Sequence, residues 1–189
     1  MNTTSRILGE ATRPPTEMEL TDPQYAYFYA RNIIKDRWPE GEAVIAKDPQ
    51  QAYYYAFDVI KGHRVGGVDG SWPEVEAAIA TDNYWAYNYA LQVIKGRFPE
   101  GEAVMATDKY WALQYAKYVI KGAFPEGEAA IATDPEYAYN YARDIIKGRF
   151  PEAEEAMAKD PEYSKKYLQA FPDAKIDWYA REWIDWTQL

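Results

Sequence analysis

The 189-residue sequence contains no cysteine and a single histidine. Without cysteine, a disulfide framework, a thiolate zinc site and a cysteine nucleophile are all excluded. His63 has no second histidine with which to share a transition metal. One histidine and three serines also do not indicate a Ser-His-acid catalytic triad. Paired carboxylates are too abundant to single out an acid-base pair. We therefore expect no metal, no cofactor and no catalysis.

Basic residues are in the minority and form no block. The sequence has 30 Asp and Glu against 21 Lys and Arg, a net charge of −9. Binding to DNA, RNA or an anionic membrane depends on Lys and Arg side chains that neutralise phosphates and release their counterions. This composition therefore argues against direct contact with nucleic acid or with a membrane surface. No apolar run approaches the roughly 18 residues of a membrane span, and the first ten residues lack the apolar core of a signal peptide. We expect a cytoplasmic protein with no membrane contact.

What the sequence does contain is a repeat. The segment that begins Asp22-Pro-Gln-Tyr-Ala-Tyr-Phe-Tyr-Ala recurs with changes, and a degenerate copy opens a sixth unit; the later copies begin at Asp48, Asp82, Asp108, Asp134 and Asp160. The spacing is 26 residues except after Asp48, where it is 34. The second unit therefore carries an insertion of eight residues.

Each unit has the pattern of two helices. In the fifth unit, Asp134 suits an N-cap, Pro135 the first helical position and Gly148 a C-terminal stop. Ala138, Tyr141, Ala142, Ile145 and Ile146 then form one apolar stripe, whereas Arg143 points away. One such pair cannot bury its own apolar face, so neighbouring pairs must stack. The pattern predicts an all-α solenoid of about six 26-residue helix-turn-helix repeats.

The periodicity also predicts the boundaries. First helices are expected at 23–35, 49–61, 83–95, 109–121 and 135–147, and shorter second helices are expected to begin at Pro39, Pro73, Pro99, Pro125 and Pro151. Residues 1–20 are a lead-in segment, 21–163 the array with its insertion at 63–71, and 164–189 a C-terminal cap. Within this cap, 177–184 is expected to form a capping helix that covers the last repeat with Trp178, Trp183 and Trp186.

Recurring tyrosines and lysines have structural interpretations. Base stacking is one conceivable role for the repeated tyrosines, but their place beside Ala and Ile favours an inter-repeat core; they are Tyr55, Tyr89, Tyr115 and Tyr141. A lysine in the last turn of a helix complements the helix dipole, which accounts for the row Lys35, Lys61, Lys95, Lys121 and Lys147.

Two surfaces are candidate binding sites. The first turns of the second helices carry glutamates that we expect to form an acidic ridge, comprising Glu74, Glu76, Glu100, Glu102, Glu126 and Glu128. Such a ridge is either a solvated face or an imitation of a nucleic-acid backbone.

The second candidate comes from departures from the repeat. Outward polar positions become apolar in the first three units, at Phe28, Tyr54, Phe57 and Leu91, which indicates an apolar protein-binding surface. Alternatively, the lead-in segment folds back over it with Ile7, Leu8, Met18 and Leu20. The glycine-rich insertion lies in the same region and adds His63, Arg64 and Asp69 as candidate contacts.

The unit Asp-Pro-x-Tyr-Ala-Tyr-x-Tyr-Ala-Arg-Asp-Ile-Ile-Lys-Gly-Arg-Phe-Pro-Glu, best seen at 134–152, resembles the short tyrosine-rich repeats of uncharacterised proteins encoded by tailed bacteriophages. The resemblance covers residues 21–163 and brings no catalytic residues with it. It implies phage origin and action inside an infected bacterium.

We expect a non-enzymatic binding protein. The resemblance suggests an inhibitor that docks on a host protein, such as a nuclease complex of an antiviral defence system, and blocks it sterically. The alternatives are a nucleic-acid mimic acting through the acidic ridge, a solenoid that binds a small ligand or nucleotide in inter-repeat clefts with Tyr, Arg and Lys, and a virion-associated structural protein.

Overall fold

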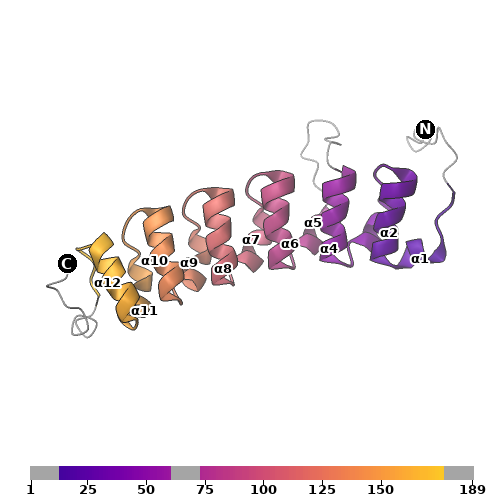
Figure 1. The fold of residues 1–189 in the computed structure, drawn as a ribbon. Helices are drawn as coiled ribbons and strands as arrows, with labels where there is room; N and C mark the ends of the chain where they lie inside the picture. The colour runs from indigo at the N-terminus through magenta and orange to yellow at the C-terminus, as the bar shows by residue number, and fades with distance from the viewer. Residues whose placement is uncertain (1–12, 61–72, 177–189) are drawn as a thin grey trace. The chain divides into compact units, whose positions relative to one another are not determined.

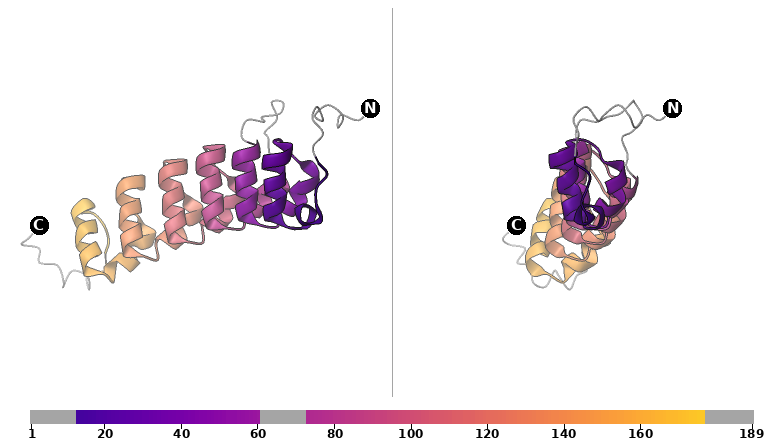
Figure 2. Two further views of the ribbon diagram at one scale, coloured as in Figure 1. Left: turned by 45° about the vertical axis from the view of Figure 1, so that its right-hand side comes forward. Right: turned by 90° about the vertical axis from the view of Figure 1, so that its right-hand side faces the viewer.

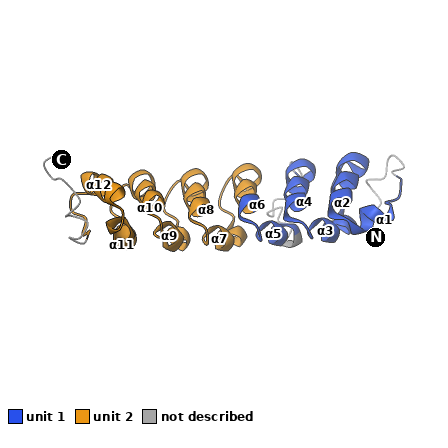
Figure 3. Cartoon of the chain, turned by 60° about the horizontal axis from the view of Figure 1, so that its bottom comes forward, with its two compact units in different colours: residues 1–85 blue, residues 86–189 orange. Residues whose placement is uncertain are grey.

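The computed structural model describes residues 13–60 and 73–176, apart from the side chains of residues 73 and 74. Every element in these ranges is a helix, which confirms the all-α repeat array that the sequence predicts (Figure 1). The chain divides into two compact units, Met1–Trp85 and Ala86–Leu189 (Figure 3).

Unit 1 begins with a short helix that precedes the repeats. Its elements are α1 (Glu17–Thr21), α2 (Pro23–Tyr29) with the π-helical η2 (Ala30–Ile34), α3 (Pro39–Ile45), α4 (Pro49–Tyr54) with the π-helical η3 (Tyr55–Ile60), and α5 (Pro73–Ile79). The next helix, α6 (Asn83–Asn88), contains the boundary between the units.

Unit 2 repeats the same order. It comprises η4 (Tyr89–Ile94), α7 (Pro99–Met105), α8 (Lys109–Gln114), η5 (Tyr115–Ile120), α9 (Pro125–Ile131), α10 (Pro135–Tyr141), η6 (Ala142–Ile146), η7 (Pro151–Ala153), α11 (Glu154–Ala158) and α12 (Pro161–Ala170). Within each unit the first helices lie side by side in one layer and the second helices form another (Figure 2).

The first helices begin as predicted. The Asp22 carboxylate accepts from the backbone N–H groups of Gln24 and Tyr25, and Asp134 accepts from those of Glu136 and Tyr137. These bonds satisfy donors that the first helical turn leaves without partners. Proline occupies the first helical position after four of the aspartates, at Pro23, Pro49, Pro135 and Pro161.

The ends of the first helices differ from the prediction. In each described case the second half is a π-helix, and the residue after it is a lysine in the left-handed region, with φ between 55° and 58°, at Lys35, Lys95, Lys121 and Lys147. Both Lys95 and Gly96 donate their N–H groups to the Ala90 carbonyl. The Ala90 carbonyl thus accepts two successive N–H groups, and the left-handed residue that ends the helix is the lysine. We had expected the helix to end at the glycine, one residue later.

The buried stripe is confirmed where the helix is α-helical. Ala138, Tyr141 and Ala142 are buried, and Arg143 is exposed. Ile146 and its neighbour Ile145 are only half-buried. They lie in η6, where i→i+5 hydrogen bonds put more residues in each turn and rotate later side chains away from the predicted 100° spacing.

Glycine in the second helices makes room for an aromatic ring. A Cβ on Gly101 would lie 2.6 Å from Cδ1 of Phe98, and a Cβ on Gly127 would lie 2.6 Å from Cδ1 of Phe124 and 2.7 Å from Cβ of Ala112. The fifth unit has Ala153 at this position, and there the helix begins as the 3₁₀ turn η7 instead of an α-helical turn. In the third and fourth units, glycine at this position thus leaves the space that the ring occupies.

The two ends of the array are partly described. The helix α1 (Glu17–Thr21), capped by Thr16, runs one residue past the expected end of the lead-in at residue 20, and α12 runs across the boundary expected at residue 163. The capping helix expected at 177–184, with its tryptophans, lies outside the described residues. Among the helices that are described, none has the length and apolarity needed to cross a membrane.

Candidate functional site

In four of the repeats, a buried tyrosine joins the repeat to the one before it. The Tyr115 hydroxyl donates to Oε1 of Glu102 at 2.8 Å and accepts from the Phe98 backbone N–H at 2.8 Å. Its ring packs edge-on against Phe124 of its own repeat, with centroids 5.2 Å apart. Burial, with a smaller effect of the Glu102 charge, raises the pKa of the Tyr115 hydroxyl.

The same arrangement recurs at three other tyrosines. Tyr55 bonds to Glu42 and Trp38, Tyr141 to Glu128 and Phe124, and Tyr167 to Glu154 and Phe150. These rings are fully buried. The tyrosine row is therefore an inter-repeat core, as the sequence indicates, and offers no platform for bases.

An arginine completes three of these networks. Nε and Nη2 of Arg97 each lie 2.7 Å from a carboxylate oxygen of Glu102, and Arg37 and Arg149 pair in the same way with Glu42 and Glu154. The Arg97 hydrogen bonds lower the pKa of Glu102, so this buried carboxylate remains ionised at neutral pH. In the fourth unit, Ala123 takes the place of the arginine.

This network divides the expected acidic ridge. Glu102 is buried and satisfied by Arg97 and Tyr115, so it does not belong to an exposed face. Glu76 and Glu128 are half-buried, Glu100 and Glu126 are exposed, and the side chain of Glu74 lies outside the described residues. Sequence periodicity placed both glutamates of each pair on one face, but the second one turns inward to the tyrosine.

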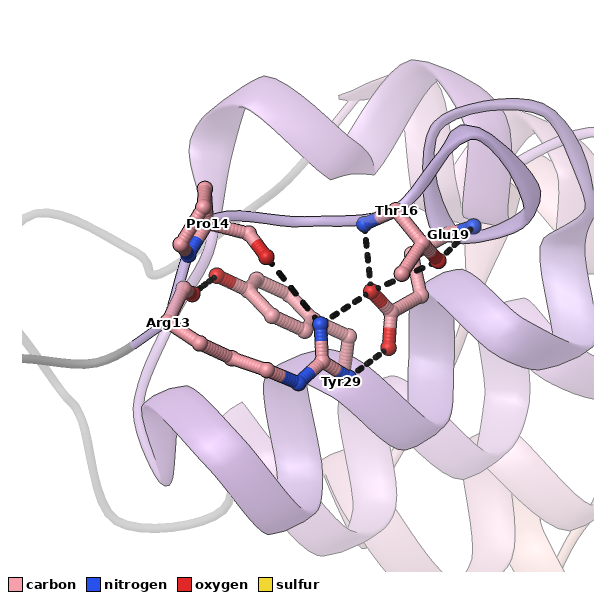
Figure 4. Close-up of polar contacts among 5 residues, drawn as sticks. All are labelled: Arg13, Pro14, Thr16, Glu19 and Tyr29. Carbon is pink, nitrogen blue, oxygen red and sulfur yellow. Dashed lines mark hydrogen bonds and ion pairs between the residues drawn. The ribbon is translucent and has the colours of Figure 1, made fainter.

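The N-terminal end of unit 1 has its own version of the network (Figure 4). Arg13 forms a bidentate pair with the buried carboxylate of Glu19, and the Tyr29 hydroxyl donates to the Arg13 carbonyl at 2.5 Å. Thr16 and Glu19 form a capping box that starts α1. The sequence did not indicate this pair: Arg13 and Glu19 are six residues apart and precede the repeats, whereas each later pair is separated by five.

The apolar departures of unit 1 do gather in one cluster. The Tyr27 ring lies 5.3 Å from Phe28 and 6.1 Å from Tyr54, and the Tyr53 ring lies 5.5 Å from Tyr54 and 5.9 Å from Phe57. Trp85 continues this cluster, 5.1 Å from Tyr53 and 5.5 Å from Tyr54, and Tyr84 packs on Trp85 at 4.6 Å. We call these seven side chains the N-terminal aromatic surface.

Its members differ in exposure. Phe28 and Tyr84, at the two ends of the cluster, are 40% and 50% exposed. Tyr54 and Phe57 are half-buried, so the expectation of fully exposed side chains is wrong for them, because Tyr53 and Trp85 pack against their rings. Leu91 belongs to unit 2 and is also half-buried there.

A polar edge borders this surface. The Tyr27 hydroxyl donates to the Asp58 carboxylate at 2.5 Å, and Nε of Arg31 lies 3.4 Å from the same carboxylate. Arg31 also lies over the Tyr27 ring, 5.9 Å from its centroid. Burial and then the Asp58 hydrogen bond raise the pKa of Tyr27, which remains a neutral donor. An apolar centre with a charged rim is the usual composition of a protein interface.

The alternative of self-cover by the lead-in segment receives no support from its described part. Met18 and Leu20 are themselves exposed, by 53% and 48%. Ile7 and Leu8 lie outside the described residues. So does the insertion, with its candidate contacts His63, Arg64 and Asp69.

Unit 2 contains a cleft that the sequence analysis did not single out. It has a volume of about 280 Å³ and lies between the first helices of two successive repeats, α8–η5 and α10–η6. Its lining includes Tyr110, Leu113, Lys117, Glu136, Tyr137 and Arg143. The signal for it was Leu113, which stands where other repeats have a tyrosine.

The residues that the structure describes contain no group of three or more histidine or acidic side chains placed to hold a metal ion. The candidate sites are thus a surface and a cleft, both without an obvious reactive group. Comparisons of the chain with protein-family models, with curated proteins and with solved structures find no match.

Proposed function

We propose that this chain is a non-enzymatic helical-repeat protein that binds another protein through the N-terminal aromatic surface. The observation that carries the proposal is the contiguity of seven aromatic side chains whose end members, Phe28 and Tyr84, are exposed. Clustered exposed apolar groups with a charged rim mark protein-binding sites more often than isolated ones do. The Asp58 and Arg31 pair supplies such a rim.

The resemblance to phage-encoded tyrosine-rich repeats suggests which class of protein the partner belongs to. On that basis we propose a host protein, such as a nuclease complex of an antiviral defence system, which the chain blocks by steric docking in the bacterial cytoplasm. Mimicry of nucleic acid through the acidic ridge is the weaker candidate, because Glu102 is buried and already paired with Arg97.

The test compares two exposed aromatic side chains. Phe28→Ala removes an exposed ring of the N-terminal aromatic surface, and Tyr118→Ala removes a ring of similar exposure, 46%, from η5 in unit 2. Wild type and both variants are used to recover partners from a bacterial extract, and the dissociation constant of each is then measured with the recovered protein. Truncating an aromatic anchor at an interface commonly costs about 2 kcal/mol, roughly thirtyfold in affinity.

We expect the thirtyfold loss for Phe28→Ala alone, with melting temperatures of both variants near that of wild type. If Tyr118→Ala weakens binding and Phe28→Ala does not, the interface lies in unit 2. If neither variant changes the affinity, the aromatic surface is not the binding site.

A further inference from the structure

The first helices pack through a second aromatic layer outside the buried tyrosine row. A tyrosine five residues after the capping aspartate contacts an aromatic ring of the next repeat: Tyr53 with Trp85 in unit 1, and Tyr87 with Trp111 and Tyr139 with Tyr163 in unit 2. Their centroids are 5.1, 5.4 and 6.1 Å apart. Each of these junctions is thus filled by a ring from the earlier helix.

Leu113 breaks this layer. It occupies the tyrosine position of the fourth repeat, and the ring it would meet in the next repeat is Tyr137. Leu113 and Tyr137 both line the cleft of about 280 Å³. A leucine is shorter than a tyrosine and has no ring to place on Tyr137, so the cleft occurs at the junction from which a ring is missing.

Two opposite charges at this cleft form no ion pair among the described residues, although the Lys117 charge helps to lower the pKa of the nearby Asp144 carboxylate. Arg143 and Asp144 satisfy each other through bonds of 2.6 and 2.9 Å. By contrast, no ion pair among the described residues includes Lys117 or Glu136. The Lys117 ammonium lies over the Tyr118 ring, and Glu136 interacts with the Tyr163 hydroxyl. The cleft therefore presents the Lys117 cation and the Glu136 anion beside the position from which a ring is missing.

We propose that this cleft binds a free aromatic amino acid, phenylalanine or tyrosine. Its ring takes the place between Leu113 and Tyr137 that a tyrosine fills at the other junctions. Its carboxylate faces Lys117 and its ammonium faces Glu136. The volume lies just below the range of about 300–1,000 Å³ typical of sites for drug-sized ligands, which suits a ligand with a single ring.

The site belongs to unit 2 and its proposal does not depend on the protein-binding role of unit 1. The test follows the Leu113 methyl resonances of the full chain by NMR while L-phenylalanine is added. We expect saturable shifts with a dissociation constant on the order of 1 mM, as befits a small open site. Unchanged Leu113 resonances at 20-fold higher concentration, about 20 mM, would overturn the proposal.

Variants of the same layer provide the decisive comparison. Leu113→Tyr restores the ring of the repeat, and we expect it to weaken phenylalanine binding at least tenfold while the melting temperature stays the same or rises. Binding by this variant is followed by calorimetric titration, because Leu113 is then absent. Tyr87→Leu is the matched control: it removes a ring from the neighbouring junction, where Leu91 and Tyr110 stand in place of Lys117 and Glu136, and it should leave the affinity unchanged. Equal binding by wild type and Leu113→Tyr would place the ligand elsewhere and refute the assignment.

Ligand analogues separate a free amino acid from a peptide side chain. 3-Phenylpropionate lacks the ammonium and 2-phenylethylamine lacks the carboxylate, so each should bind several-fold more weakly than phenylalanine. N-acetylphenylalanine amide lacks both charges and represents a side chain within a peptide. If it binds as tightly as phenylalanine, the cleft recognises the ring alone and the amino-acid proposal is wrong.

Discussion

Replacing Tyr115 with phenylalanine tests whether the buried hydroxyl network holds neighbouring repeats together. The substitution removes one oxygen and retains the ring, whose packing against Phe124 stays in place. Two hydrogen bonds are lost, one from the Phe98 N–H and one to the ionised Glu102. Both groups are buried, so water cannot replace the hydroxyl without rearrangement.

The magnitude follows from those two groups. An orphaned buried donor costs about 1–3 kcal/mol, whereas Glu102 keeps both hydrogen bonds from Arg97 and is only partly deprived. We expect Tyr115→Phe to lower the free energy of unfolding by about 2–3 kcal/mol. Urea unfolding followed by circular dichroism measures this loss.

Tyr141→Phe is the matched variant. Tyr141 makes the same two bonds, at 2.7 Å from Phe124 N and 2.8 Å to Glu128. Because Glu128 is half-buried, water can hydrate this carboxylate after the hydroxyl is removed. We therefore expect a smaller loss than for Tyr115→Phe.

Hydrogen exchange provides a local readout for the same pair of variants. Exchange of the Phe98 amide should accelerate in Tyr115→Phe, and exchange of the Phe124 amide in Tyr141→Phe. An unfolding free energy of Tyr115→Phe within about 0.5 kcal/mol of wild type, with an unchanged Phe98 amide, would refute this account of how the repeats are joined.

Gly127→Ala places a Cβ where the adjacent ring and helix leave no room, and we expect a loss of about 1–3 kcal/mol in urea unfolding, whereas Gly122→Ala, whose Cβ would meet nothing closer than 3.9 Å, should be tolerated. Equal effects of the two would show that the ring is free to move aside. Ala123→Arg introduces the arginine that pairs with the equivalent of Glu128 in other repeats. It should raise the free energy of unfolding by about 0.5–1 kcal/mol at low salt, and by less at 1 M NaCl. A melting temperature below that of wild type would contradict this. Glu19→Gln tests acid stability: the arginine hydrogen bonds lower the pKa of this carboxyl to about 2, so its contribution is complete above the unfolded pKa of about 4.5 and is lost as the pH falls toward 2. Thermal melts from pH 7 to pH 2 should therefore show a shallower decline for the variant, and parallel curves would exclude the ion pair as the cause.

The repeat and its helices could be predicted because their signals are local. Asp134 and Pro135 define a helix start through local backbone hydrogen bonding that needs no tertiary contact. Because the sequence repeats every 26 residues, the same start can be predicted in the other units. The π-helical halves could not be predicted in this way. They depend on which N–H groups reach a carbonyl such as that of Ala90, and glycine after Lys95 looked like an ordinary stop.

The candidate sites were predictable only in part. Helical geometry correctly indicated that Phe28 departs from the repeat on an exposed face, because exposure there depends on one helix. The inward turn of Glu102 depends on Tyr115, which is thirteen residues away in the next repeat. A second signal was present in the sequence, since arginine precedes the inward glutamate by five residues in three units, but a helical wheel of one helix does not reveal it.

Positions that join repeats and positions that distinguish them have different physical requirements. Tyr115 and its equivalents Tyr55, Tyr141 and Tyr167 each satisfy a backbone N–H and a carboxylate of the preceding repeat, so a change there leaves polar groups without partners. In the outer layer, the rings of Tyr53 and Tyr87 pack on tryptophans of the next repeat, and replacing tyrosine by Leu113 leaves a cleft but no orphaned polar group among the residues that line it. New binding properties can therefore arise in the outer layer at little cost to folding. This is why the departures from the repeat, at Phe28 in unit 1 and at Leu113 in unit 2, are where we place the two binding sites.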